Sequence, residues 1–171
     1  LVPIATVLTE SVAFVASHQG RKHTMPQQLA IVDRATRRWE VVSEAWDHEV
    51  EAPLAWSEDG SAIFFASEQK GQRHLWRFDI ASRRAEVVAE GSWVESFDHA
   101  AGSLVSVISS ASHPARVHAH LPGCAPVRIE TFNDALLRKL AIGRVEERWF
   151  DGAQGDPVQM WLTFPPGFDD A

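Results

Sequence analysis

Leu-Trp-Arg-Phe-Asp-Ile-Ala-Ser-Arg-Arg-Ala-Glu-Val-Val, residues 75–88, has an earlier relative in the same chain. Residues 29–42 are Leu-Ala-Ile-Val-Asp-Arg-Ala-Thr-Arg-Arg-Trp-Glu-Val-Val. The leucine, the aspartate, an alanine, the arginine pair, the glutamate and the valine pair recur in register, 46 residues apart. A period of this length is typical of proteins that repeat one small structural unit.

Each copy has the pattern of two strands joined by a tight turn. Trp76, Phe78 and Ile80 occupy alternate positions, and a polar turn then leads into a Val-Val strand. An aspartate begins the turn in both copies, at Asp33 and Asp79. We expect its carboxylate to accept a hydrogen bond from a backbone N–H two residues on, which would set the register of the next strand.

A second turn signal is Asp59-Gly60, which lies between two apolar runs and is typical of a hairpin because glycine adopts a positive φ without steric cost. The run that follows, residues 62–67, is almost entirely apolar, which predicts a strand with both faces covered by neighbouring sheets. Residues 52–89 are therefore expected to form one unit of four antiparallel strands, which is typical of a β-propeller blade. The predicted strands are residues 52–56, 61–67, 74–80 and 85–89.

The predicted fold class is all-β, a partial β-propeller of two to three four-stranded antiparallel blades. An earlier blade holds the first copy of the repeat, and a looser unit begins at Trp93 and ends at residues 126–130. After Thr131 the repeat stops. We expect Asn133 to cap a short helix that contains Leu140 and stops at Gly143.

A C-terminal β-hairpin is predicted beyond the helix. Residues 145–150 and 158–164 have strand patterns and are separated by a polar loop that begins with Asp151-Gly152. The chain starts without methionine and in the middle of a pattern, so we expect it to be part of a longer protein.

Composition excludes several classes of partner. The chain of 171 residues has 16 lysines and arginines against 23 aspartates and glutamates, and its basic residues cluster only in pairs, so nucleic acid is not expected as a partner. The longest apolar runs are strand-sized, well short of the roughly 20 residues of a membrane helix, so no membrane association is expected. One cysteine, Cys124, excludes an internal disulfide and multi-cysteine metal motifs, and leaves the cellular compartment undetermined. No cofactor or metal is predicted.

Several motifs follow one another in a particular order along the chain. They are Trp56-Ser-Glu-Asp-Gly, the Leu-Leu helix after Asn133, Val145-Glu-Glu, Asp151-Gly152, Met160-Trp-Leu and Pro165-Pro-Gly-Phe-Asp. This order resembles the prolyl oligopeptidase family of serine peptidases, especially its acylaminoacyl-peptidase and dipeptidyl-peptidase-like members. The resemblance implies that residues 1–131 are propeller blades. It also implies that residues 132–171 are a linker helix and the first strands of an α/β-hydrolase domain, whose remainder lies outside this chain.

No catalytic residue is predicted in the chain. The nucleophile motif Gly-x-Ser-x-Gly is absent from the sequence, so a serine, histidine and acid triad cannot be completed and no activity is expected from these residues alone. The resemblance implies a non-catalytic propeller and hinge portion that gates the access of short peptides to a catalytic domain. The alternative is a β-propeller interaction module with no enzymatic role.

Four residues are candidates for substrate gating: Asp47, His48, Glu49 and Glu51. They form an acidic segment that leads into the first strand of a blade, and such strands line the central channel of a propeller. The resemblance implies that acidic residues on loops facing the active site can hold the free amino end of a peptide. A plain solvated loop is the simpler interpretation of the same residues.

Two further interpretations remain open. His118 and His120 lie two apart on a predicted strand and share a face, which would allow a metal site in a small metalloenzyme, but no third ligand is indicated and a solvated pair is favoured. Incomplete propellers leave apolar sheet faces uncovered, so we expect self-association of the isolated chain. The other expected partners are further blades, the hydrolase domain and short peptides.

Overall fold

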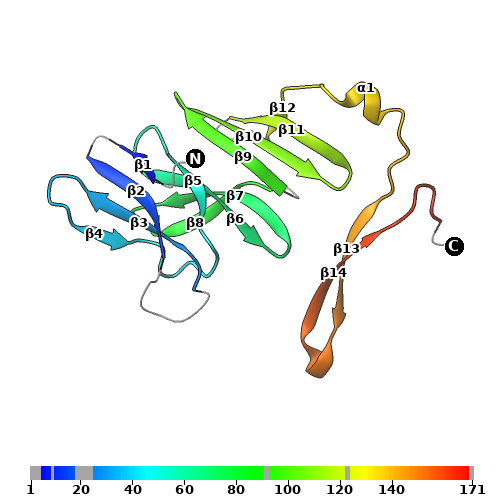
Figure 1. The fold of residues 1–171 in the computed structure, drawn as a ribbon, viewed down its shortest axis with the longest axis horizontal. Coiled ribbons are helices and arrows are strands. Elements are labelled where there is room, and N and C mark those ends of the chain that lie inside the picture. The colour runs from blue at the N-terminus through cyan, green and yellow to red at the C-terminus, as the bar shows by residue number, and fades with distance from the viewer. Residues whose placement is uncertain (1–4, 9, 18–24, 91–92, 122–123, 170–171) are drawn as a thin grey trace.

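The structure is a computed structural model that describes residues 5–8, 10–17, 25–90, 93–121 and 124–169. Three antiparallel units of four strands follow one another along the molecule, and a short helix then leads to a two-stranded hairpin (Figure 1). This arrangement confirms the predicted all-β fold of blade-like units. Within the described ranges, no helix is both long enough and apolar enough to cross a membrane.

The first blade consists of β1 (Ala5–Val7), β2 (Ser11–Ala16), β3 (Gln28–Asp33) and β4 (Trp39–Val41), paired in that order. The earlier copy of the repeat forms β3, the turn after it and β4. The second blade consists of β5 (Glu51–Trp56), β6 (Ala62–Gln69), β7 (Gln72–Asp79) and β8 (Arg84–Ala89), and the later copy forms the corresponding half of it.

The third blade consists of β9 (Trp93–Ala100), β10 (Ser103–Ser110), β11 (His113–His120) and β12 (Val127–Arg128). The second and third blades are joined at one position, where Arg73 of β7 pairs with Trp93 of β9 in parallel. Strand β5 contacts both β1 and β9, so the first strands of successive blades lie side by side, as in strands around the axis of a propeller.

The middle blade is covered on both faces, which explains the unbroken apolar run in β6. Ile63 and Phe65 are fully buried in a cluster that includes residues of the first blade, such as Leu29. Phe64 and Ala66 point the other way and pack in a cluster with Val94, Phe97, Leu104 and Ile108 of the third blade. Successive residues of a strand point to opposite faces, so an apolar residue is needed at every position.

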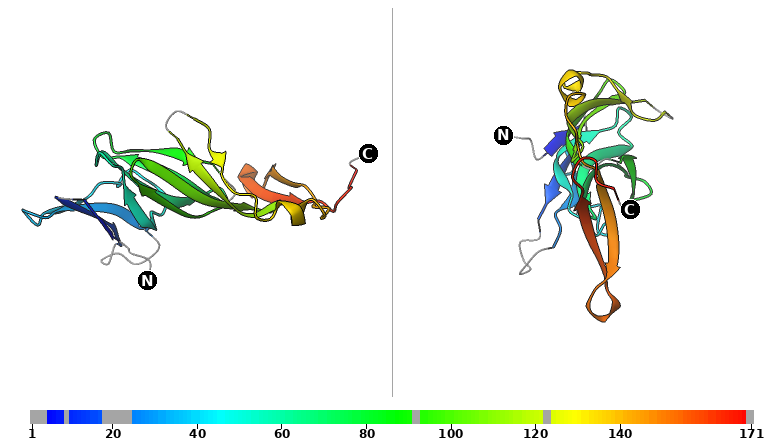
Figure 2. Two further views of the ribbon diagram at one scale, coloured as in Figure 1. Left: turned by 90° about the horizontal axis from the view of Figure 1, so that it is seen from above. Right: turned by 90° about the vertical axis from the view of Figure 1, so that its right-hand side faces the viewer.

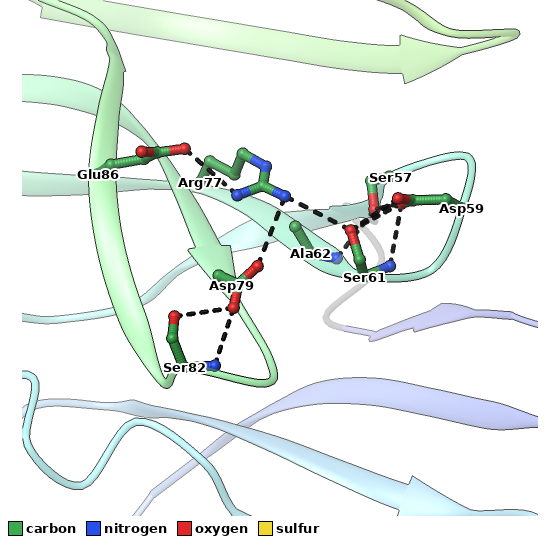
Figure 3. A network of polar contacts seen from close by, with 8 residues as sticks. All are labelled: Ser57, Asp59, Ser61, Ala62, Arg77, Asp79, Ser82 and Glu86. Carbon is green, nitrogen blue, oxygen red and sulfur yellow. Dashed lines mark hydrogen bonds and ion pairs between the residues drawn. The ribbon is translucent and has the colours of Figure 1, made fainter.

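The aspartates that begin the repeat turns accept hydrogen bonds from the third residue after them. The Oδ1 atom of Asp33 accepts from the N–H of Thr36 at 2.6 Å and from its hydroxyl at 2.8 Å. Asp79 makes the same two contacts with Ser82, both at 2.8 Å (Figure 3). The main contacts are therefore with the residue three positions on, while the residue predicted, two positions on (Ala35 or Ala81), gives the carboxylate a weaker backbone hydrogen bond. The fourth residue after each aspartate, Arg37 or Arg83, has a φ of 58° or 56°. Asp79 pairs with Arg84, and Asp33 bonds to Arg38 in the same way, so each turn is a four-residue loop and not a two-residue hairpin.

The Asp59-Gly60 turn has the predicted geometry, with Gly60 at a φ of 71°. Oδ1 of Asp59 accepts hydrogen bonds from the hydroxyl of Ser57 at 2.7 Å and from the N–H of Ser61 at 3.0 Å. The guanidinium of Arg77 lies between this turn and the Asp79 turn and contacts residues on both sides (Figure 3).

The helix after the third blade is shorter than predicted. It is α1 (Asp134–Leu137), and it ends before Leu140 and Gly143 are reached. Asn133 lies at its N-terminus, but its side chain makes no capping hydrogen bond, and its backbone oxygen accepts from Leu137. No residue of the helix is buried, so its leucines have no surface against which a longer amphipathic helix would be stabilised.

The C-terminal hairpin consists of β13 (Val145–Asp151) and β14 (Pro157–Thr163), as predicted. A single turn of 3₁₀-helix, η1 (Ala153–Gly155), lies in the loop between the two strands. Figure 2 shows that the hairpin projects away from the row of blades.

Candidate functional site

The strand order of a blade brings certain loops to one face of the molecule. The antiparallel strands reverse direction at each turn, so the turn between the second and third strands lies on the same side as the connection to the next blade. We name this side the loop face. It includes residues 43–50 between the first two blades, the turn at residues 70–71 and the turn at residues 111–112.

The connection at residues 43–50 is anchored at both ends. Near its start, the hydroxyl of Ser43 accepts a hydrogen bond from the N–H of Leu29 at 2.9 Å. Near its end, the N–H of Val50 donates to the backbone oxygen of Gln27 at 2.9 Å. Between them, the ring of Trp46 packs edge-on against Trp76, with centroids 4.6 Å apart. The backbone of this connection is therefore held in one position on the loop face.

Three of the predicted gating residues lie on this anchored connection. Asp47 and Glu49 are exposed, and His48 is half-buried beside Trp46, with ring centroids 5.2 Å apart. The side-chain amide of Gln69 donates to Nε2 of His48 at 3.1 Å, since an amide nitrogen can only donate. The two carboxylates flank a fixed histidine and can attract a cationic group in solvent.

The fourth candidate, Glu51, lies inside the blade junction. Its Oε2 atom is 2.8 Å from Nε of Arg73, and Arg73 is only 8% exposed. The guanidinium also donates to the backbone oxygens of Val94 and Glu95 at the start of the third blade. The structure therefore gives the carboxylate of Glu51 a role in joining two blades.

A cavity of about 790 Å³ lies on the loop face beside this junction. Its walls come from the second blade, the third blade and the hairpin, and they include Gly71, Trp93, His113 and Trp161. We did not predict this cavity, because its lining residues are far apart in the sequence and none belongs to a motif for binding. The exposure of Trp93 and Trp161, at 37% and 42%, is visible only in the structure.

The histidine pair on β11 is not the solvated pair favoured from the sequence, because His118 is half-buried and His120 is buried. Nε2 of His120 is 2.7 Å from the hydroxyl of Ser106, and His120 is only 7% exposed. Burial lowers the pKa of both His118 and His120, which favours their neutral forms. Across the described ranges, no group of three or more histidine, cysteine, aspartate or glutamate side chains is arranged to hold a metal ion.

Known proteins share both the sequence and the architecture of the chain. It is 22% identical over 168 residues to dipeptidyl-peptidase 5 of Porphyromonas gingivalis, an alignment that covers 94% of this chain and 24% of the relative. Its backbone matches an acylaminoacyl peptidase of Pyrococcus horikoshii with a TM-score of 0.75 at 17% identity, over 91% of this chain and 24% of that one. The chain is therefore similar in fold to the propeller region of such peptidases.

The family resemblance inferred from the motifs is thereby confirmed. The chain is also similar to the β-propeller domain of the Trilobed protease from Pyrococcus furiosus, with a TM-score of 0.61 at 17% identity, over 77% of this chain and 38% of that one. No family model matches the chain. Because the chain spans only 24% of the length of the dipeptidyl-peptidase, it corresponds to a part of such a protein.

Proposed function

We propose that this chain is the non-catalytic propeller and hinge portion of a serine peptidase of the prolyl oligopeptidase family. In this proposal it gates the access of short peptides to a catalytic domain outside these residues. Residues 1–131 are the propeller part, and residues 132–171 are the linker helix and the first strands of the hydrolase domain.

The observation that carries the proposal is the form and position of the hairpin. Strands β13 and β14 pair with each other and lie beside the loop face of the second and third blades. A lone two-stranded hairpin is marginal in water, and this one keeps four large apolar side chains between 38% and 48% exposed. These properties suit the beginning of a larger sheet that faces the loops of the propeller. The four side chains are Trp149, Phe150, Val158 and Trp161.

The proposed gate selects peptides by size and by charge. Blades placed over a catalytic domain leave narrow routes that short peptides can use and folded proteins cannot. Asp47 and Glu49, exposed on the loop face, supply negative charge that attracts the free amino end of a peptide. Glu51 supports the site indirectly, through the ion pair with Arg73.

The coding sequence beyond Ala171 tests the proposal first. We expect it to continue into a segment with a Gly-x-Ser-x-Gly motif, followed by an acid and a histidine. A reading frame that stops without these residues would overturn the peptidase function.

Kinetics of the full-length protein test the gate. For Asp47→Asn combined with Glu49→Gln, we expect KM to rise about two- to fivefold for peptides with a free amino end, the range of an exposed ion pair. The same peptides with an acylated amino end should be unaffected. The control is Glu58→Gln, which removes an exposed carboxylate on the opposite face of the blades. It should leave KM unchanged for both kinds of peptide. An equal change for both kinds of peptide would contradict the role in holding the amino end.

A second function, a propeller that serves as an interaction module, is favoured by one observation. Apolar side chains in and after the last strand of the third blade are strongly exposed, with Val127 at 51%, Ile129 at 58% and Phe132 at 84%. Such a patch is suited to a protein partner. A full-length protein without a nucleophile motif that still binds another protein through these three residues would support this function.

A further inference from the structure

We infer that the β6–β7 turn of the middle blade is a docking site for the C-terminal hairpin, and that this contact sets the position of the hairpin relative to the blades. The docking contact consists of Gln159 and Trp161 on β14 against Lys70 and Gly71 in the turn. The inference concerns the chain itself and does not depend on the proposed function.

The polar half of the docking contact joins residues 89 positions apart. The side-chain amide of Gln159 donates a hydrogen bond to the backbone oxygen of Lys70 at 2.8 Å. The same amide donates to Oε1 of Glu147 on the paired strand at 3.1 Å, which holds it in the orientation that reaches the turn. Because the acceptor on the turn is a backbone atom, the side chain of Lys70 takes no part in this bond.

The second half of the docking contact is the close approach of the Trp161 indole to Gly71 in the turn. Gly71 has a φ of 67°, which L-amino acids with a side chain rarely adopt. A Cβ atom at this position would lie 3.1 Å from Nε1 of Trp161 and 3.8 Å from Oε1 of Gln159. Trp161 lies against the bare backbone of the turn, and Gln159 shares its face because the two are alternate residues of one strand.

The linker does not itself hold the hairpin in place. Its first end is fixed to the third blade by Arg128, which pairs with Glu130 at 2.7 Å and with Asp134 at 2.6 Å. Its second end is fixed to the hairpin, since a side chain at Gly143 would overlap the backbone oxygen of Phe164. Between them, residues 138–142 are all exposed. A segment without buried side chains allows the hairpin to turn relative to the blades.

The docking contact also determines the shape of the cavity on the loop face. Val145, Trp161 and Thr163 of the hairpin form one wall, and Trp93 and His113 of the third blade are on the others. When the hairpin is docked, the cavity has the volume of about 790 Å³. The cavity is already open to solvent on one side, and when the hairpin is released that wall moves away and the cavity widens.

Distance measurements between spin labels test the inference, on doubly labelled chain diluted in an excess of unlabelled chain so that self-association adds no distances between molecules. Labels are attached at Glu44→Cys on the blades and Asp156→Cys on the hairpin, both exposed positions, in a chain with Cys124→Ser. With the docking contact intact we expect one narrow distance distribution. With Gln159→Ala and Trp161→Ala together, we expect a broad distribution, with the undocked population raised at least about tenfold, because one hydrogen bond and one aromatic contact are lost.

Two controls separate docking from general damage. Lys70→Gln keeps the backbone oxygen that accepts the bond and should leave the distribution narrow. Phe150→Ala removes an apolar side chain, 47% exposed, from the opposite face of the hairpin and should also leave it narrow. Circular dichroism should show that all variants retain the strands. A narrow, unchanged distribution in the double variant, or equal broadening by Phe150→Ala, would overturn the inference.

Discussion

At the scale of single residues, aspartates define the corners of the blades. Asp33, Asp59 and Asp79 each accept hydrogen bonds from a backbone N–H and from a serine or threonine hydroxyl. These bonds stabilise the charged carboxylate, and they lower the pKa of Asp59 to about 2, chiefly through the hydroxyl of Ser57. The same carboxylates hold the turns that set the strand register.

The first prediction concerns these carboxylates in acid. The pKa of Asp59 is about 2 in the folded chain and near the ordinary value of 3.8 in the unfolded chain. The charged carboxylate therefore makes its full contribution to the free energy of unfolding above about pH 4. It is lost as the pH falls from there towards 2. Urea denaturation between pH 2 and pH 6 should show a midpoint that falls in acid, with a smaller fall for Asp59→Asn. If the urea midpoint fell equally with pH in the parent chain and in Asp59→Asn, the prediction would be contradicted.

The second prediction concerns His120, whose pKa is lowered by burial and by the neighbouring His118. The ordinary pKa of a histidine is 6.5. Below this pH, the histidine binds a proton more readily in the unfolded chain than in the folded chain, so the free energy of unfolding should fall as the pH drops further. His120→Gln has no proton to take up and can keep a hydrogen bond to Ser106. Thermal melting at pH 7 and pH 5 should therefore show a smaller difference for this variant than for the parent chain.

At the scale of elements, the junction of β5, β7 and β9 depends on one buried arginine. Arg73 joins Glu51 of its own blade to backbone oxygens at the start of the next blade. The sheets otherwise meet through side chains in the two apolar clusters. The position of the third blade therefore depends on a polar contact as well as on packing.

The third prediction compares a buried pair with an exposed one. Arg73→Met leaves Glu51 without its partner in a largely desolvated position and should lower the free energy of unfolding by about 3 kcal/mol. Arg83→Met breaks the pair between Arg83 and Glu40, whose side chains are 50% and 62% exposed, and should cost less than about 1 kcal/mol. Urea denaturation of the two variants measures both values. Equal losses would show that the junction does not depend on Arg73.

At the scale of the whole molecule, three blades form a row with two ends. The middle blade is covered on both faces, but the first and third blades are each covered by one neighbour among the described residues. In a closed propeller every blade has two neighbours. The uncovered faces suit further blades or a second copy of the chain.

The fourth prediction follows from these uncovered faces. The isolated 171-residue chain should self-associate, with a sedimentation coefficient that rises with protein concentration in the micromolar range. Full-length protein with all of its blades should not behave in this way. An isolated chain that remains monomeric at every concentration would contradict the prediction.

The local structure of this protein was largely determined by its sequence alone. The repeat, the Asp-Gly turn and the alternation of apolar residues predicted the blades and the hairpin, because strand pairing between neighbours depends on residues close in the chain. The helix was predicted too long, since its leucines find no surface to pack against. Only the tertiary structure decided which face carries residues 43–50, why Glu51 faces an arginine, and where the hairpin docks. These depend on contacts such as Lys70 with Gln159, 89 residues apart, for which local patterns contain no signal.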